Sequence, residues 1–214
     1  MQRKVNYFKK RLARFQSKGN DKNFELNKKR KIELFSGIEG TVLEIGPGIG
    51  TNFAFLNKKG IRWIGVEPNP AMHPYLLESA KKQGVSASLL DCYSEAICLP
   101  DSQVDFVICT KVLCSVSNLD RSMNEIKRVL KPGGKFLFLE HVVDNHNFLR
   151  RAVQKIVPYT PWKYYSDGCE PGRDIAASIK NAGFSSVSFI QYMQEGKGLI
   201  HAIKKPHIYG SAIK

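Results

Sequence analysis

The sequence predicts an α/β fold in which a doubly wound, mainly parallel sheet carries helices on both faces. Three observations support this prediction. An apolar run over 41–45 leads into a cluster of glycines, short apolar runs then alternate with helical segments up to residue 140, and the second run ends at an acidic residue, Glu67. Alternating strands and helices predict parallel strands joined by right-handed crossovers.

The length and composition indicate a single globular domain. The chain has 214 residues, of which 43% are hydrophobic and 24% charged. No apolar run has the length of a membrane span, and we expect no signal peptide. The five cysteines include no C-x-x-C pair, so we expect reduced thiols, a cytoplasmic location and no metal site.

Positive charge is concentrated near the N-terminus. The formal net charge is +14, and residues 1–35 hold 12 Lys or Arg against 3 Asp or Glu. Such an excess favours an anionic partner: nucleic acid, a membrane surface or an acidic protein. A solvated helix face gives the same pattern, so both interpretations stay open.

Residues 1–36 are expected to form a basic helical extension to one domain that spans 37–214. An amphipathic helix is predicted over 2–15 by apolar residues at spacings of 3 and 4: Val5, Phe8, Leu12 and Phe15. A second helix is predicted over 24–35. The first helix either packs over the ligand cleft or lies on a membrane surface, and its short length favours packing.

The stretch TVLEIGPGIGTN, residues 41–52, predicts a buried strand, a sharp turn and the start of a helix. A dinucleotide fingerprint would require glycine at position 51, which is Thr51. Glu44, just before the glycines, would repel a pyrophosphate but would attract an ammonium group. S-adenosylmethionine (SAM) carries an ammonium, so the loop suits SAM better than a nicotinamide dinucleotide. A plain strand–helix turn is the alternative.

Glu67 ends the second predicted strand, 61–66, and lies 21 residues beyond Gly46. In a doubly wound fold, an acid at this position accepts hydrogen bonds from both ribose hydroxyls of a nucleotide cofactor. The alternative is that Glu67 caps the next helix, predicted over 70–83.

The remaining elements follow from apolar runs and turn signals. Strands are predicted over 86–90, 104–109, 135–140, 186–192 and 207–213, and helices over 120–130, 147–157 and 174–181. We expect Asp120 to cap the helix 120–130 and Asp105 to have a structural role. An alternative register places the last strand at 198–204. The first five strands should lie in the order 3-2-1-4-5, with the ligand above strands one and four.

Several stretches together resemble the class I SAM-dependent methyltransferases, specifically the methyltransferase type 11 domain. They are LEIGPGIG at 43–50, VEPNP at 66–70, SEAICLPDSQVDFVICT at 94–110 and RVLKPGGKFLFLEH at 128–141. The resemblance implies a Rossmann-like, seven-stranded sheet of order 3-2-1-4-5-7-6 with strand seven antiparallel. It also implies SAM as cofactor and S-adenosylhomocysteine as product.

Within that class, the chain is most similar to the methyltransferase-like 7 group, which methylates thiol small molecules. The supporting residues are those of 109–116, Trp162-Lys163, 167–169, Arg173, 206–210, Ala212 and Lys214. The chain departs from this group by lacking the apolar membrane-anchoring segment of the animal members. It also departs at Pro47 in the glycine loop and at Glu170.

The resemblance implies roles for individual residues. Glu44, Gly46 and Gly48 would hold the methionine end of SAM, Gly50 would permit the turn, and Asn52 would help bind the carboxylate. Glu67 would bind the ribose, with Pro68 and Asn69 beside the adenine. Ser94 would donate its N–H to the adenine ring, Glu95 or its rival Asp91 would accept from the exocyclic amine, and Thr110 would lie near the sulfonium.

The general base that deprotonates the acceptor is not assigned by the sequence. The candidates at the cleft mouth are His141, Asp167, Lys111 and Cys114. Three of them have a simpler alternative interpretation: His141 as the end of a strand, Lys111 as a solvated surface lysine and Cys114 as a small buried hydrophobe. Four aromatic residues either wall an acceptor pocket or pack in the ordinary way: Tyr159, Trp162, Tyr164 and Tyr165.

The sequence thus predicts a SAM-dependent methyltransferase that acts on a thiol or another apolar, lipid-like small molecule. Two alternatives remain: an RNA or protein methyltransferase, favoured by the charge, and a non-catalytic SAM-binding module. Against RNA, the segment Thr110–Leu113 lacks the Pro-Pro-aromatic signature of enzymes that methylate amino groups of bases, and no nucleic-acid module is recognisable. We expect a cytoplasmic protein, and peripheral membrane contact through its basic first helix stays open beside packing over the cleft.

Overall fold

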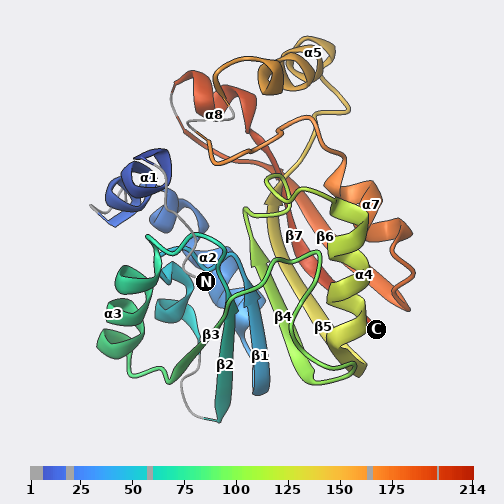
Figure 1. Cartoon of the computed structure of the whole chain (residues 1–214). Coiled ribbons are helices and arrows are strands. Elements are labelled where there is room, and N and C mark those ends of the chain that lie inside the picture. Colours follow the sequence, from blue (N-terminus) through green and yellow to red (C-terminus); the bar gives the residue numbers. More distant parts are fainter. Residues whose placement is uncertain (1–6, 18–21, 57–59, 163–165, 197) are drawn as a thin grey trace.

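The computed structural model describes residues 7–17, 22–56, 60–162, 166–196 and 198–214, and Figure 1 shows the whole chain. Its centre is a seven-stranded sheet of order β3-β2-β1-β4-β5-β7-β6, in which β7 runs antiparallel to both of its neighbours. The strands are β1 (Gly40–Ile45), β2 (Ile61–Val66), β3 (Ala87–Leu90), β4 (Val104–Thr110), β5 (Leu130–His141), β6 (Ser186–Met193) and β7 (Pro206–Ile213). The predicted fold class and strand order are confirmed.

Helices cover both faces of the sheet. The α-helices are α1 (Tyr7–Ser17), α2 (Lys22–Phe35), α3 (His73–Gln83), α4 (Leu119–Val129), α5 (Phe148–Ile156), α7 (Ile175–Asn181) and α8 (Leu199–Ile203), and the 3₁₀ helices are η1 (Thr51–Phe55) and η2 (Val157–Tyr159). In Figure 1, α4 and α7 lie on one side of the sheet, and α2 and α3 lie on the other.

Two hydrophobic clusters, one on each face of the sheet, hold these layers together. Successive strand residues alternate between the clusters, so that Leu43 packs with Ile126 of α4 while Val42 packs with Phe35 of α2 and Leu76 of α3. This alternation follows from the two-residue period of a strand. A sheet covered on both faces needs the nearly continuous apolar strands that the sequence contains.

The predicted structural role of Asp105 is supported by its contacts at the start of β4. One carboxylate oxygen accepts from the backbone N–H of Thr41 at 2.8 Å, and the other pairs with the ammonium of Lys131 at 2.7 Å. Asp105 therefore joins the beginnings of three neighbouring strands, β1, β4 and β5. This alignment sets the height at which the opposite ends of those strands emerge at the candidate site.

The predicted regular alternation of strands and helices is wrong at two connections. A five-residue 3₁₀ helix, η1, stands where an α-helix was expected after the glycine loop. Residues 91–103 join β3 to β4 through turns and bends, with one isolated bridge and no helix. The η1 segment is only five residues long, and 3₁₀ geometry is common in such short pieces.

Two further local predictions are corrected. The α4 helix is capped by Asn118, whose side chain accepts from the N–H of Arg121, and not by Asp120, which lies inside the first turn. The alternative last strand at 198–204 is wrong, because Leu199–Ile203 is helical and β7 is the final strand. Asn118 has the extended backbone that an N-cap requires, whereas Asp120 is already helical.

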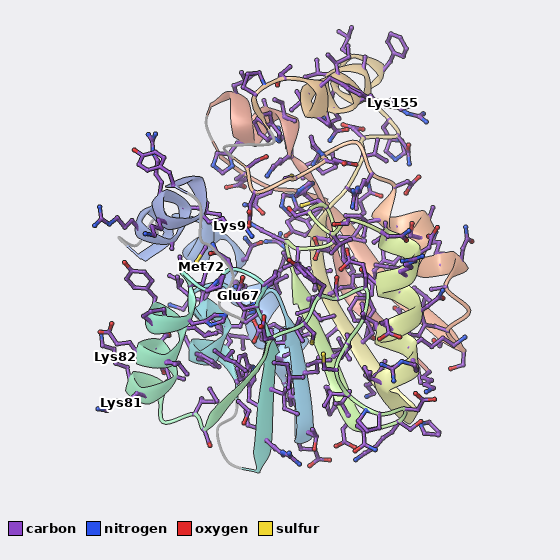
Figure 2. The ribbon with its side chains drawn as sticks, in the orientation of Figure 1. Lys9, Glu67, Met72, Lys81, Lys82 and Lys155 are labelled. Carbon is purple, nitrogen blue, oxygen red and sulfur yellow. The ribbon has the colours of Figure 1, made fainter. Side chains whose placement is uncertain are left out.

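The first helix lies at the edge where β2 ends. The side-chain amide of Asn69 donates to the backbone oxygen of Lys9 at 3.4 Å, and Figure 2 shows Lys9 on the same side as Glu67 and Met72. This position agrees with the predicted packing of the first helix over the ligand cleft. Val5 lies outside the described residues, and the side chains of Phe8 and Phe15 are not described either.

Leu76→Ala is expected to lower the free energy of unfolding by about 2–5 kcal/mol, because it empties a packed site beneath the glycine loop. Leu76 is fully buried, whereas its neighbour Leu77 is 47% exposed. Leu77→Ala is the matched control and should change stability by less than about 1 kcal/mol. Urea unfolding of both variants measures the difference, and equal losses would contradict this packing.

Candidate active site

The candidate site lies at the carboxyl edge of the parallel strands, where the strand order reverses. The glycine loop leaves β1, Glu67 follows β2, and Thr110 ends β4. Because β1 lies between β2 and β4, all three segments meet at one place. Doubly wound sheets bind their ligands at this switch point.

The glycine loop adopts a backbone conformation that other residues rarely reach. Gly46 has φ +60° and Gly50 has φ +81°. A Cβ atom on Gly46 would come within 2.6 Å of the Val112 side chain, and one on Gly50 within 2.5 Å of the Phe53 ring. Because these glycines have no Cβ atom, the loop can pack directly against the Val112 side chain and the Phe53 ring.

Glu67 ties this loop to the end of β2. One carboxylate oxygen accepts from the backbone N–H of Gly48 at 2.9 Å, and the other accepts from the N–H of Asn69 at 2.8 Å. The side chain is buried, and this burial raises its pKa despite the two hydrogen bonds. The alternative role of Glu67 as a helix cap is not observed, because the residue before α3 is Met72.

Glu44 is more deeply buried than Glu67 and is held by side chains from two elements, η1 and β2. Its two oxygens accept from the Asn52 amide at 2.8 Å and from the Trp63 indole at 3.0 Å. The same amide nitrogen also donates to the Thr110 hydroxyl at 2.9 Å, which links η1 to the end of β4. Complete burial raises the pKa of Glu44.

Asn52 leaves one polar atom unused. Its Oδ1 is buried and has no hydrogen-bond partner within the described residues. A buried acceptor without a partner is costly, and a bound ammonium group would satisfy it. This geometry favours contact of Asn52 with the ammonium of SAM over the predicted contact with its carboxylate, since the Nδ2 donors already serve Glu44 and Thr110.

Lys31 of α2 is a site residue that the sequence analysis did not single out. Its ammonium is buried beside Glu44 and lies 5.3 Å from the centre of the Phe55 ring. Burial lowers the pKa of Lys31 to about 8, and the attraction of Glu44 opposes that shift. The only sequence signal was the basic run 28–31, which does not distinguish a buried lysine from solvated ones.

Ser94, Glu95 and Asp91, which were predicted to contact the adenine, differ in exposure and in hydrogen-bond partners. Ser94 is buried, and its hydroxyl contacts the Glu95 carboxylate at 3.0 Å and the Ser122 hydroxyl at 2.9 Å. Glu95 is occupied by the loop before α4, where it accepts from the backbone N–H groups of Ser117 and Asn118. Asp91 directly follows β3 and is exposed, so it is better placed than Glu95 to accept from an adenine amine.

A cavity of about 190 Å³ adjoins this edge on the side of β4 and β5. The residues that matter below are among those lining it: Lys111, Cys114, His141, Cys169, Lys204 and His207. The strand register contributes to this arrangement, because it sets His141 of β5 opposite His207 of β7. The cavity thus combines three of the four candidate catalytic residues with three that the sequence analysis did not select for this role.

Asp167 and the aromatic residues are placed differently. Asp167 is exposed and is not among the residues that line the cavity. Trp162 is half-buried and donates its indole N–H to the backbone oxygen of Cys169 at 3.0 Å, so it supports the cavity from behind. Tyr159 is 91% exposed and walls no pocket, while Tyr164 and Tyr165 lie outside the described residues.

The electrostatic environment of the cavity is strongly perturbed. Burial and the nearby ammonium groups of Lys31 and Lys204 lower the pKa of Lys111 to about 8. His141 Nε2 lies 3.2 Å from the Cys169 sulfur, and hydrogen bonds from Cys114 and His141 lower the pKa of Cys169. Clusters of perturbed titratable groups in a cavity are typical of functional sites.

A larger cavity of about 290 Å³ lies elsewhere. Its lining includes Phe106 and Lys135, near the starts of β4 and β5, and Glu33 of α2. It therefore opens near the amino ends of the parallel strands, opposite to the edge where such sheets bind ligands.

Comparison with known proteins agrees with the fold. Residues 43–138 match the family described as methyltransferase domain. A crystal structure of a SAM-dependent methyltransferase from Aquifex aeolicus shares the fold, with a TM-score of 0.65 and 18% identity over 95% of this chain and 97% of that one. The chain has the structure of a SAM-dependent methyltransferase, with SAM as its cofactor.

Two curated relatives place the chain more closely. It is 34% identical to the human thiol S-methyltransferase TMT1A over 200 residues, which are 86% of this chain and 78% of that protein. It is 35% identical to the rat thiol S-methyltransferase TMT1B over 204 residues, which are 90% of this chain and 82% of that protein. The chain belongs to the family of these thiol S-methyltransferases.

None of the helices in the described part of the chain combines the length and the apolar composition needed to cross a membrane.

Proposed function

We propose that this protein transfers the methyl group of SAM to the sulfur of a small apolar thiol. The observation that carries the proposal is the cavity beside Thr110, which is small and lined by the ammonium groups of Lys111 and Lys204. Positive charge near a thiol favours its thiolate, which is the nucleophilic form. The thiol S-methyltransferase activity named for the relatives supports the same acceptor class.

The cofactor would lie along the edge from β1 to β3. Glu67 would accept from the ribose hydroxyls, with Pro68 and Asn69 beside the adenine, Asp91 at its amine and the Ser94 N–H at its ring. Gly46, Gly48 and Gly50 would let the methionine part approach the backbone, and Asn52 Oδ1 would accept from its ammonium. Glu44 would act by holding Asn52 and by supplying negative charge, since it is more deeply buried than Glu67 and its oxygens accept hydrogen bonds from the Asn52 and Trp63 side chains.

Catalysis in this proposal depends on alignment and charge. When bound, SAM supplies an electrophilic methyl group on a sulfonium, and its transfer to a thiolate leaves S-adenosylhomocysteine. Thr110, at the end of β4, separates the Asn52 network from the acceptor cavity that begins at Lys111. Such positioning of two reactants supplies several kcal/mol, with upper estimates of about 7–11 kcal/mol. Lys111 and Lys204 stabilise the thiolate while it waits for transfer.

A small acceptor accounts for the site better than a polymer does. The cavity of about 190 Å³ would hold a small molecule, whereas RNA or protein would need an open groove at the same edge. The net charge of +14 keeps RNA as the second candidate. A non-catalytic SAM-binding module would not need perturbed groups in a separate acceptor cavity.

The location and the partners are part of the proposal. We propose a cytoplasmic enzyme that meets its apolar acceptors at a membrane surface. All five cysteines are free thiols, which supports a reducing compartment. The basic first helix remains one candidate for membrane contact, and its position beside Asn69 supports the competing role of covering the cofactor.

Incubation with labelled SAM tests the acceptor class. Alkyl thiols should be methylated, whereas the matched alcohols, total RNA and lipid vesicles should not. Lys204→Gln should lower kcat/KM for thiols about three- to tenfold, since one nearby charge is worth on the order of 1 kcal/mol. Lys205→Gln, at the exposed neighbouring position, is the control. Methyl transfer to RNA alone would overturn the proposal.

Glu67→Ala tests the assignment of the cofactor edge. The variant loses the carboxylate that would accept hydrogen bonds from the ribose hydroxyls and that accepts them from two backbone N–H groups. SAM should therefore bind about 10- to 100-fold more weakly in calorimetry. Glu78→Ala, an exposed change on α3, should leave the affinity unaltered. If Glu67→Ala bound SAM as tightly as the unaltered chain, the ribose assignment would be wrong.

A further inference from the structure

Three potential metal ligands that are distant in sequence meet inside the acceptor cavity. Cys114 follows β4, His141 ends β5, and Cys169 belongs to the loop before α7. All three are buried, and their ligand atoms lie within 4.8 Å of one another. The sequence predicts no metal site, because it contains no C-x-x-C pair, but the fold brings together two cysteines that are distant in the sequence.

The backbone around these side chains is held firmly. Glu140 accepts from the N–H groups of Val112 and Leu113 at 3.0 and 3.3 Å, which fixes the turn that carries Cys114. The N–H of Glu170 donates to the backbone oxygen of Cys114 at 2.9 Å, which binds the two cysteine-bearing segments together. Functional sites need ligands that the surrounding structure holds in place.

We propose that Cys114, His141 and Cys169 bind a zinc ion. Sulfur and imidazole donors select zinc over magnesium or calcium, which prefer oxygen. Three protein ligands are the pattern of catalytic zinc, in which a fourth position stays open for water or substrate. His141 directs its Nε2 atom into the cluster, where it lies 3.2 Å from the Cys169 sulfur.

The open position would face the cavity that receives the acceptor. This part of the inference rests on the proposed function. The acceptor thiol replaces a zinc-bound water, its proton passes to solvent, and its sulfur binds the metal as a thiolate. That sulfur then forms a bond to the methyl carbon as the carbon–sulfonium bond breaks, so that a thioether and S-adenosylhomocysteine result. Zinc lowers the pKa of a bound water or thiol, so that the bound group is deprotonated near neutral pH.

The charges of the cavity fit this arrangement. A zinc ion with two cysteine thiolates is neutral, and a third thiolate from the acceptor makes the centre negative. Lys111 and Lys204 line the same cavity, and one ammonium group is enough to offset that single negative charge.

The metal content of the full chain, purified without chelator and supplied with zinc, tests the site. Mass spectrometry of the metals should find about one zinc per chain. Cys169→Ser should lose it, whereas Cys98→Ser, an exposed cysteine outside the cluster, should keep it. Binding of S-adenosylhomocysteine by each variant, measured by calorimetry, shows that the cofactor edge remains folded.

Cobalt substitution of the unaltered chain gives a readout that does not depend on any variant. Cobalt in the site should show thiolate charge-transfer absorption, and an added alkyl thiol should shift the spectrum. A chain that binds no zinc, or that retains zinc in Cys169→Ser, would overturn the site. Thiol methylation by metal-free chain at the full rate would overturn the role of zinc alone, and zinc binding without thiol methylation would instead refute the proposed function.

A separate feature, helix α5, has its polar side turned inward and its apolar side turned outward. The buried side chain of Gln154 donates to the backbone oxygens of Val142 and Ile203. Arg150 pairs with Asp144. On the outer side, Phe148 is 80% exposed, Leu149 74% and Ile156 63%, which reverses the pattern of an ordinary surface helix.

We infer that this outer face of α5 binds an anionic membrane surface. Figure 1 places α5 at the outer tip of the molecule beside α8, and Figure 2 shows Lys155 there. Arg151 and Lys155 are exposed on the same helix, and the chain carries a net charge of +14. Basic residues that flank an apolar helix face are typical of interfacial helices. A second copy of the chain would bring like charges together.

Flotation with vesicles tests this surface. Vesicles that contain phosphatidylserine should carry the full chain, neutral vesicles should carry less, and salt should weaken the binding. Leu149→Glu should reduce flotation at least fivefold, whereas Leu77→Glu, at an exposed leucine of α3, should not. Equal flotation of the two variants would refute the assignment. So would a dimer, seen by light scattering, that Leu149→Glu dissociates.

Discussion

The glycine bend after β1 is the constraint on which the candidate site depends. It is held between two buried carboxylates, Glu67 through the N–H of Gly48 and Glu44 through Asn52. Burying two carboxylates is costly unless each is hydrogen-bonded, and both are. The buried ammonium of Lys31 adds an opposing charge beside Glu44. The loop therefore has its shape before any ligand arrives.

The proposed cofactor site and the proposed acceptor cavity lie side by side at one edge of the sheet, because β4 and β1 are neighbours. The Asn52 side chain of η1 donates to the hydroxyl of Thr110. Lys111, which directly follows Thr110, lines the acceptor cavity of about 190 Å³. Lys111 has φ +60°, a conformation that is uncommon for a residue with a side chain. This abrupt turn directs the chain from the cofactor edge into the acceptor cavity within one residue.

Features that depend on local pattern could be predicted from the sequence. The strand order follows from the alternation of apolar runs, and Glu67 follows from its distance from Gly46. Contacts between close neighbours overturned one local prediction, because Asn118 and not Asp120 caps α4. Such contacts also give Glu95 backbone partners in the loop before α4, while its adenine role stays a prediction. These outcomes depend on which hydrogen-bond partners lie within reach of a side chain in the folded structure, and a pattern of residue types does not contain that information.

Contacts between distant segments could not be predicted. Cys114 and Cys169 are distant in the sequence and meet where the N–H of Glu170 bonds to the backbone oxygen of Cys114. Lys31 is one of several lysines in a basic helix, and only its packing against Phe55 and Glu44 distinguishes it. The reversed polarity of α5 was hidden as well, because an amphipathic helix has the same sequence pattern whichever face it buries.

The most direct measurement of the central claim is a crystal structure of the chain with S-adenosylhomocysteine. The adenosine should lie beside Glu67, its homocysteine part should follow the bend from Gly46 to Gly50, and its sulfur should face Thr110 and the acceptor cavity. A bend closed by neighbouring side chains and empty of ligand would contradict the claim. A nicotinamide dinucleotide bound at that bend would contradict it equally.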